Sequence, residues 1–210
     1  MKKALIVIFI SIFIVNFSVG AYTKTGHPDI TELTFKEKGK LLINMTSSEL
    51  DKAFASTGRR CFWGWKHHFM NIYSEADYVG EVIFARVNRT SDPIKFDYSI
   101  KETDYIERSV KTTGSISGSF GSKIKQIDCK LQGEYRREVT KKTAHTKVED
   151  NSFSVVVKPY TRLTYKITGE ALVTNGVSKH YVFGILIKKG TWEYIDIVTA
   201  YYELCEEPLE

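Results

Sequence analysis

The chain has 210 residues, three cysteines and a formal net charge of +5. This length suits one domain or two small elongated ones. The basic residues are scattered rather than clustered, which argues against a nucleic-acid-binding protein, and three cysteines are too few for a disulfide-dense scaffold.

The N-terminus has the pattern of a secretory signal peptide. Lys2 and Lys3 precede an apolar run from Ala4 to Val15, and small residues follow up to Gly20-Ala21. We therefore expect residues 1–21 to be cleaved near Gly20-Ala21 and the mature protein to be secreted. An uncleaved N-terminal anchor is the alternative. Removal of the two lysines lowers the formal charge from +5 to +3, which permits only a modest attraction to an anionic surface.

Residues 22–77 are expected to form a small N-terminal α/β region with one short helix. Thr46 to Glu49 has the form of a capping box, and Leu50, Ala53 and Phe54 follow at helical spacing. The aromatic patch after this helix contains Trp63 and Trp65, for which two interpretations are open. The pair either packs in a small core under the helix, which we favour because large aromatic residues are mostly buried, or contacts a receptor, a glycan or a membrane interface.

Residues 78–210 are expected to form an elongated β domain. Alternating apolar and polar residues predict long strands rich in Ser and Thr, with a turn at 88–93 and a hairpin turn at Asn175-Gly176. Strands in compact domains average five or six residues. The longer alternating stretches here, such as 94–114 and 139–157, therefore predict an elongated, strongly twisted antiparallel sheet.

The segment 115–139 alternates strictly on both sides of a polar break at Lys125–Asp128. Such alternation predicts two paired strands, each with one apolar face. Residues 115–124 and 129–138 have the length of a membrane-spanning strand. The apolar face either packs on the protein's own sheet or inserts into a bilayer, and the periodicity alone fits both interpretations.

Chemistry-bearing motifs are scarce. The sequence contains no nucleophile elbow, phosphate-binding loop, His-Glu-x-x-His motif or dinucleotide fingerprint. We therefore expect no enzyme activity, no cofactor and no metal site. Among the cysteines, Cys61–Cys205 is the first disulfide pairing to consider, because Cys129 falls in the apolar register of the hairpin. Three separate thiols are equally compatible with the spacing.

The layout of the β region resembles that of aerolysin-like pore-forming toxins, in particular the epsilon-toxin and mosquitocidal-toxin branch. The matching features are the long stretch Lys95–Gly114, the hairpin 115–139, the second long stretch Thr140–Ser154, and Val155-Val156-Val157-Lys158-Pro159-Tyr160. The resemblance covers roughly residues 78–204.

This resemblance implies that the amphipathic hairpin lies packed on the sheet of the soluble monomer, then joins hairpins of other copies in a membrane barrel. Its partners would be a target membrane, a receptor of unknown identity and further copies of the chain, without nucleic acid. The lipid-facing residues would be Ile116, Gly118, Phe120, Ile124, Leu131, Gly133 and Tyr135. The lumen-facing residues would be Ser115, Ser117, Ser119, Lys130, Gln132, Glu134 and Arg136.

The sequence thus predicts a secreted, oligomerising, membrane-perforating β protein. The alternative is a non-lytic secreted or cell-surface protein of the same fold that binds a glycan or a protein, for which Trp63 and Trp65 are the candidate contacts.

Overall fold

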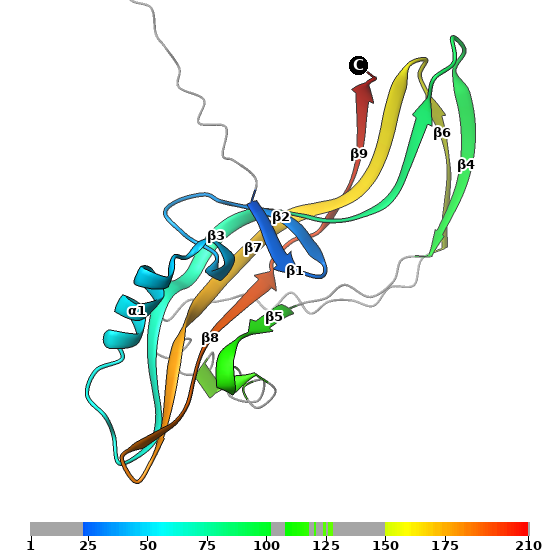
Figure 1. Cartoon of the computed structure of the whole chain (residues 1–210). Helices are drawn as coiled ribbons and strands as arrows, with labels where there is room; N and C mark the ends of the chain where they lie inside the picture. Colours follow the sequence, from blue (N-terminus) through cyan, green and yellow to red (C-terminus); the bar gives the residue numbers. More distant parts are fainter. Residues whose placement is uncertain are drawn as a thin grey trace, which may run out of the picture.

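The structure of the protein is a computed structural model, which describes residues 23–101, 108–117, 120, 124, 126–127 and 150–209. The molecule is elongated, with two long curved strands that run along its length (Figure 1). The elements, with η for a 3-10 helix, are β1 (Thr23–His27), β2 (Ile30–Phe35), η1 (Leu42–Asn44), α1 (Ser47–Ala55), β3 (Trp63–Asn88), β4 (Ile94–Lys101), β5 (Arg108–Thr112), η2 (Gly114–Ile116), β6 (Asp150–Val157), β7 (Thr161–Val182), β8 (Ile185–Ile197) and β9 (Tyr201–Pro208). The expected mainly β fold with long antiparallel strands and one short helix is confirmed.

The main sheet is built on β3 and β7, which pair antiparallel from Trp63↔Val182 to Asn88↔Thr161. The other edge of β7 is shared by two strands: β8 pairs with its C-terminal half and β9 with its N-terminal half. The strand order is β1-β2-β3-β7-β8-β5, and all pairings are antiparallel. Consecutive long strands joined by short turns account for the elongated shape.

The sheet curls until its two edge strands, β1 and β5, approach each other. Two apolar clusters pack on the sheet, and they lie on opposite faces because Ile195 alternates with Trp192 and Tyr194 along β8. The first packs Leu33 and Tyr78 against Val173 and Ile195. The second consists of Tyr73, Ile116, Phe120, Ile124, Ile127, Trp192 and Tyr194.

A separate two-stranded ladder, β4–β6, covers the half of the long strands that lies farthest from α1 (Figure 1). Tyr98 of β4 stacks on Phe84 of β3 with ring centroids 4.0 Å apart, and Phe153 of β6 lies 5.6 Å from Tyr165 of β7. This contact is aromatic and small, so β4 and β6 are held mainly by each other.

The predicted helix is confirmed with its cap. Thr46 accepts a hydrogen bond from the backbone N–H of Glu49, and the Glu49 carboxylate accepts one from the backbone N–H of Thr46. The turn predicted at 88–93 is confirmed as well, since it joins β3 to β4.

The hairpin turn predicted at Asn175-Gly176 is wrong, because β7 continues through both residues to Val182. The Asn175 side chain is buried and makes hydrogen bonds inside the curl. A Cβ at Gly176 would lie 2.4 Å from the carbonyl oxygen of His68, so glycine is needed for the close approach of two strands. The actual turn is at Phe183-Gly184, where both residues have positive φ, as in a two-residue hairpin.

The expected boundary between residues 77 and 78 falls inside β3, which runs from Trp63 to Asn88 without interruption. The signal peptide predicted at 1–21 lies outside the described residues. In the part of the chain that the structure describes, no helix combines the length and the apolar character needed to cross a bilayer.

The proposed Cys61–Cys205 disulfide is also wrong, because both residues are free thiols. Cys61 lies just before Trp63 at one end of the long strands, whereas Cys205 pairs with Thr164, which pairs with Ala85 near the other end. At about 3.3 Å per residue, the length of β3 between Trp63 and Ala85 holds the two thiols tens of ångströms apart. Cys129 lies outside the described residues.

Candidate functional site

The segment between β4 and β6 is the first of two candidate functional regions. The last described pair of the β4–β6 ladder is Lys101↔Asp150. Part of the chain between these two residues lies on the main sheet, where β5 pairs with the edge of β8 from Arg108↔Asp196 to Thr112↔Trp192.

Four described apolar residues of this segment are buried on the main sheet, whereas Val110 of β5 is exposed. Ile116, Phe120, Ile124 and Ile127 pack around Trp192 and Tyr194, and the Phe120 ring lies 5.3 Å from that of Trp65 and 6.0 Å from that of Trp192. Full burial of an apolar side chain contributes about 1.5–3 kcal/mol. These four side chains therefore attach the segment to the sheet together with the β5–β8 ladder.

Polar contacts fix the start of the segment to β8. The backbone N–H of Thr113 donates to the carbonyl of Thr191 at 2.9 Å, and the two threonine hydroxyls lie 2.6 Å apart. The Ser115 hydroxyl donates to the carbonyl of Lys189 and accepts from its N–H, at 3.0 and 2.8 Å. A Cβ at Gly190 would lie 2.1 Å from the carbonyl oxygen of Thr113, so glycine allows this approach.

The described residues of 115–139 do not form the expected strand. Gly114–Ile116 is a 3-10 helix, and the backbone N–H of Ile124 donates to the carbonyl of Phe120, a helical spacing. Ile116, Phe120, Ile124 and Ile127 recur every three or four residues, so the sequence fits a helix as well as a strand. The apolar and polar partition nonetheless holds where it is described: Ile116, Phe120 and Ile124 are buried, and Ser115 and Ser117 are exposed. The remaining predicted face residues, Gly118, Ser119, Lys130, Leu131, Gln132, Gly133, Glu134, Tyr135 and Arg136, lie outside the described residues.

The side chain of Arg108 attaches the edge strand β5 to β8. Arg108 forms a two-pronged ion pair with Asp196 of β8, with Nη2 2.9 Å from Oδ2, and its guanidinium lies 4.7 Å from the centre of the Tyr194 ring. Both side chains are largely buried. The ion pair therefore holds β5 against the sheet next to the apolar cluster.

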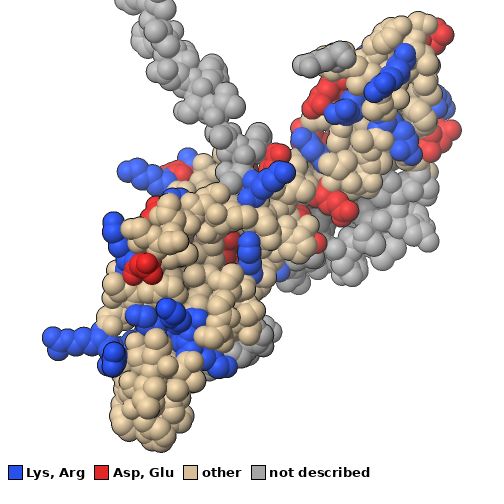
Figure 2. Space-filling view, viewed as in Figure 1, with Lys and Arg blue, Asp and Glu red and all other residues tan. Residues whose placement is uncertain are grey.

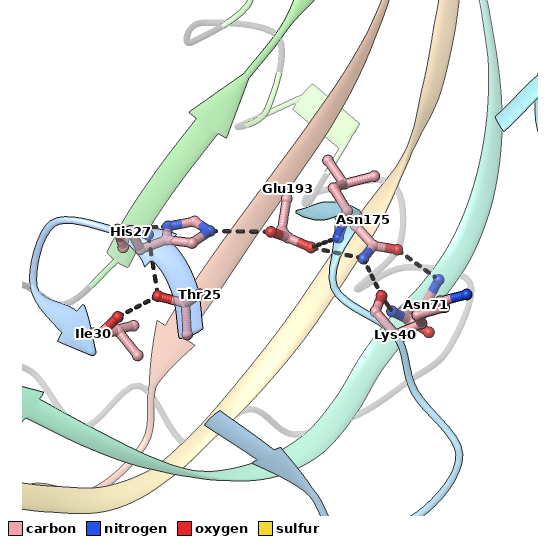
Figure 3. A network of polar contacts seen from close by, with 9 residues as sticks. Thr25, His27, Ile30, Lys40, Asn71, Asn175 and Glu193 are labelled. Carbon is pink, nitrogen blue, oxygen red and sulfur yellow. Dashed lines mark hydrogen bonds and ion pairs between the residues drawn. The ribbon is translucent and has the colours of Figure 1, made fainter. Parts of the chain in front are cut away.

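A buried polar network closes the curl of the sheet (Figure 3). Glu193 of β8 is at its centre, with Oε1 3.2 Å from His27 Nε2 of β1. Its Oε2 accepts hydrogen bonds from the Leu42 N–H and the Asn175 amide, each at 2.9 Å. His27 Nδ1 lies 2.8 Å from the Ser109 hydroxyl of β5, which links the two edge strands.

This network has the character of a structural clasp. Glu193 and His27 are buried, and each polar atom discussed above has a protein partner. The network therefore suits a role in stabilising the fold rather than in binding a substrate. Among the described residues, no group of three or more His, Cys, Asp and Glu side chains is arranged to hold a metal. Sequence analysis missed the clasp because its members come from β1, β5, β7 and β8, and no local pattern signals it.

The end of the molecule formed by the β7–β8 turn and the start of β3 is the second region, and we call it the apolar tip. It consists of Phe62, Trp63, Phe183, Ile185, Leu186 and Ile187. Phe62, Trp63, Phe183 and Ile185 are 70, 61, 66 and 64 % exposed. Phe183 packs edge-on against the rings of both Phe62 and Trp63, with centroids 5.5 and 5.4 Å apart.

The apolar tip corrects the favoured interpretation of Trp63 as a core residue. Trp65 is half-buried and stacks on His180 with centroids 4.6 Å apart, so only this second tryptophan takes a packing role. Phe183 has a φ of 50°, a left-handed conformation that costs free energy in a bulky residue. A bulky residue that adopts this backbone conformation and keeps its side chain exposed gains little folding energy from that side chain. Such a residue is typical of a contact surface.

No protein-family model and no curated protein matches this chain.

Proposed function

We propose that the protein is a secreted, non-enzymatic, membrane-perforating protein. In this proposal the segment between β4 and β6 leaves the main sheet, extends the β4–β6 ladder as an amphipathic hairpin, and forms a membrane barrel with hairpins of other copies. The aerolysin-like pattern of the sequence supports the proposal, and the observation that carries it is the register of β4 with β6.

The ladder pairs Ile94 with Val157, and its last described pair is Lys101↔Asp150. If it continued without a shift, the turn would fall at Lys125-Gln126, within the polar break. Directly opposed residues share a face. On one face the continued ladder would pair Ile116 with Tyr135, Gly118 with Gly133, Phe120 with Leu131 and Ile124 with Ile127. On the other face it would pair Ser115 with Arg136, Ser117 with Glu134 and Ser119 with Gln132.

The observed register thus sorts the two halves of the segment into one apolar and one polar face. A continuation shifted by one residue would mix them, because it would place Ile116 opposite Arg136 or Glu134. The register comes from residues outside the segment, and the face pattern comes from the sequence of the segment itself. Their agreement is the main support for an extended hairpin.

Chain direction and length are compatible with this movement. β3 runs from the apolar tip to the turn at 88–93, so β4 runs back in the direction of the tip (Figure 1). Tyr98 stacks on Phe84, and β3 covers roughly 70 Å between Phe84 and Trp63 at 3.3 Å per residue. An extended strand from Tyr98 to Lys125 would cover roughly 90 Å, so the hairpin would reach past the tip.

Partners are required by the physics of the bilayer. A single hairpin leaves two edges of unpaired backbone groups in hydrocarbon, and only a closed barrel satisfies them. The proposal therefore includes a homo-oligomer on the target membrane.

A reversible tether tests the proposal. Thr113 and Thr191, whose hydroxyls lie 2.6 Å apart, are replaced by cysteine, with Cys61, Cys129 and Cys205 replaced by serine. We expect the oxidised variant to release no dye from liposomes and the reduced variant to release it. The matched control joins two strands that stay together in the proposal: Thr164→Cys opposite native Cys205, with Cys61 and Cys129 replaced by serine.

The control should release dye in both redox states. Equal release by the oxidised and reduced tether variants would rule out movement of the segment. A wild-type protein that releases no dye at any concentration, also after limited proteolysis, would overturn perforation itself.

A further inference from the structure

The apolar tip is apolar on both faces of its hairpin. Ile185, Leu186 and Ile187 follow one another directly, and all three are exposed. Neighbouring strand residues point to opposite sides, so neither side of the turn has a polar face. A sheet face that binds another protein is apolar on one side, whereas an end that enters a lipid interface is apolar all round and contains aromatic residues.

Every charged side chain in the two stretches that form this end of the molecule is basic. Residues 56–74 and 171–192 contain no Asp or Glu. Figure 2 shows the tip as a bare end of the molecule, with Lys and Arg side chains gathered just behind it. The basic residues of the two stretches, which we call the basic belt, are Arg59, Arg60, Lys66, Lys179, Lys188 and Lys189.

The belt lies at a defined depth behind the tip. Lys66, Lys179 and Lys189 are directly opposed on three adjacent strands. From Lys179 to Val182, next to the turn, the strand rises about 10 Å. Interfacial segments bury their apolar part about 5–10 Å into the boundary between headgroups and acyl chains, which would place the belt among the headgroups.

We propose that the apolar tip and the basic belt together bind the surface of an anionic lipid bilayer. Phe62, Trp63, Phe183 and the aliphatic residues after the turn enter the interface, and the belt contacts lipid phosphates and carboxylates. An anionic bilayer is the partner that fits best, because every charged residue of the belt is positive and the lipid headgroups are negative. The proposal goes beyond perforation and does not depend on it, because binding needs no movement of the segment between β4 and β6.

Sedimentation with vesicles tests the binding. Wild-type protein is mixed with vesicles of phosphatidylcholine alone or with about a third phosphatidylserine, at low and high salt. We expect strong binding only to the anionic vesicles, with a loss at high salt because exposed charges are screened. Equal binding to both kinds of vesicle would contradict the role of the belt.

Substitutions separate the tip from the rest of the surface. Phe183→Asn with Ile185→Ser should weaken binding at least tenfold, and asparagine suits the left-handed conformation of residue 183. The matched control is Tyr160→Asn, which replaces another exposed aromatic residue with positive φ, in the β6–β7 turn at the opposite end of β7, and should leave binding unchanged. Arg59→Gln with Arg60→Gln should weaken binding roughly fivefold for each charge removed, whereas Lys24→Gln with Lys95→Gln should not.

The oxidised Thr113→Cys/Thr191→Cys variant distinguishes this proposal from perforation. Binding without dye release by that variant supports the tip as an independent docking surface. Unchanged binding by the Phe183→Asn/Ile185→Ser variant would overturn the proposal. A wild-type dimer in solution that this variant dissociates would also overturn it, because the tip would then be an interface between copies.

Discussion

The Glu193 carboxylate lies 3.2 Å from His27 Nε2, and both side chains are completely shielded from solvent. These residues belong to β8 and β1, and Ser109 continues the contact to β5. The two edges of the curled sheet are thus joined through a buried carboxyl group and an imidazole rather than through a regular ladder. This arrangement holds β5, and with it the start of the proposed mobile segment, in place.

Removal of the Glu193 carboxylate should destabilise the fold. Glu193→Ala leaves the Leu42 N–H, the Asn175 amide and His27 without an acceptor in a dry interior. We expect a loss of about 3–5 kcal/mol in the free energy of unfolding, measured by urea denaturation. Glu193→Gln keeps an oxygen for two of these donors and should lose less than half as much. Equal losses for both variants would show that the charge itself is essential.

Gly176 is predicted to tolerate no side chain. In Gly176→Ala the new methyl group would lie 2.4 Å from the His68 carbonyl oxygen and 2.9 Å from Cζ2 of Trp192. We expect about 1–3 kcal/mol of destabilisation in thermal or urea unfolding. The control is Gly184→Asn, where a Cβ meets open space and asparagine tolerates the positive φ. A Gly176→Ala variant as stable as the wild type would contradict the close approach of the strands.

The Glu49 carboxyl should titrate far below its usual range. Hydrogen bonds from Lys40, and then from the backbone and hydroxyl of Thr46, lower the pKa of Glu49 from 4.5 to about 2. A lowered folded-state pKa means that the stabilisation is present above pH 4.5 and is lost as the pH falls toward 2. Carbon-13 NMR titration of Glu49 checks this. In Lys40→Met the pKa should move back toward 4.5, and an unchanged value would contradict the assigned cause.

The Tyr78 phenol should lose its proton at a higher pH than an exposed tyrosine. Burial raises the pKa of Tyr78 to about 12, and its hydroxyl donates to the carbonyl of Thr199 at 3.2 Å. Because the folded-state value is raised, the neutral phenol stabilises the fold below pH 10, and this contribution is lost as the pH rises toward 12. Difference absorbance near 295 nm of wild type against Tyr78→Phe isolates this group. A titration centred near 10 would contradict its burial.

The sequence predicts those features that depend on interactions between residues close together in the chain. The capping box from Thr46 to Glu49 and the turn between Asn88 and Ile94 depend on neighbouring residues, and both predictions are confirmed. The turn predicted at Asn175-Gly176 failed because partners distant in the chain use these residues, Asn175 for hydrogen bonds and Gly176 for close packing.

The candidate sites were less predictable. The apolar residues between 116 and 127 suit two backbone conformations, and packing on Trp192 selects helical spacing for the described ones. Trp63 carries no sequence signal that separates a core residue from an exposed one, and its exposure follows from the position of the β7–β8 turn. The clasp around Glu193 depends on four strands, so only the folded sheet reveals it.

The central claim is that the segment between β4 and β6 enters the membrane as a hairpin in the register of that ladder. A fluorophore attached to single cysteines along 115–135 tests it most directly, on anionic vesicles whose acyl chains carry a quencher. The quencher is confined to the bilayer, so burial of Ile116, Phe120 and Ile124 in the soluble fold gives no signal. We predict quenching at positions 116, 118, 120 and 124 and at 131, 133 and 135, and none at 115, 117 and 119 or at 130, 132 and 134. Absence of quenching at every position, or quenching without this alternation, would contradict the claim.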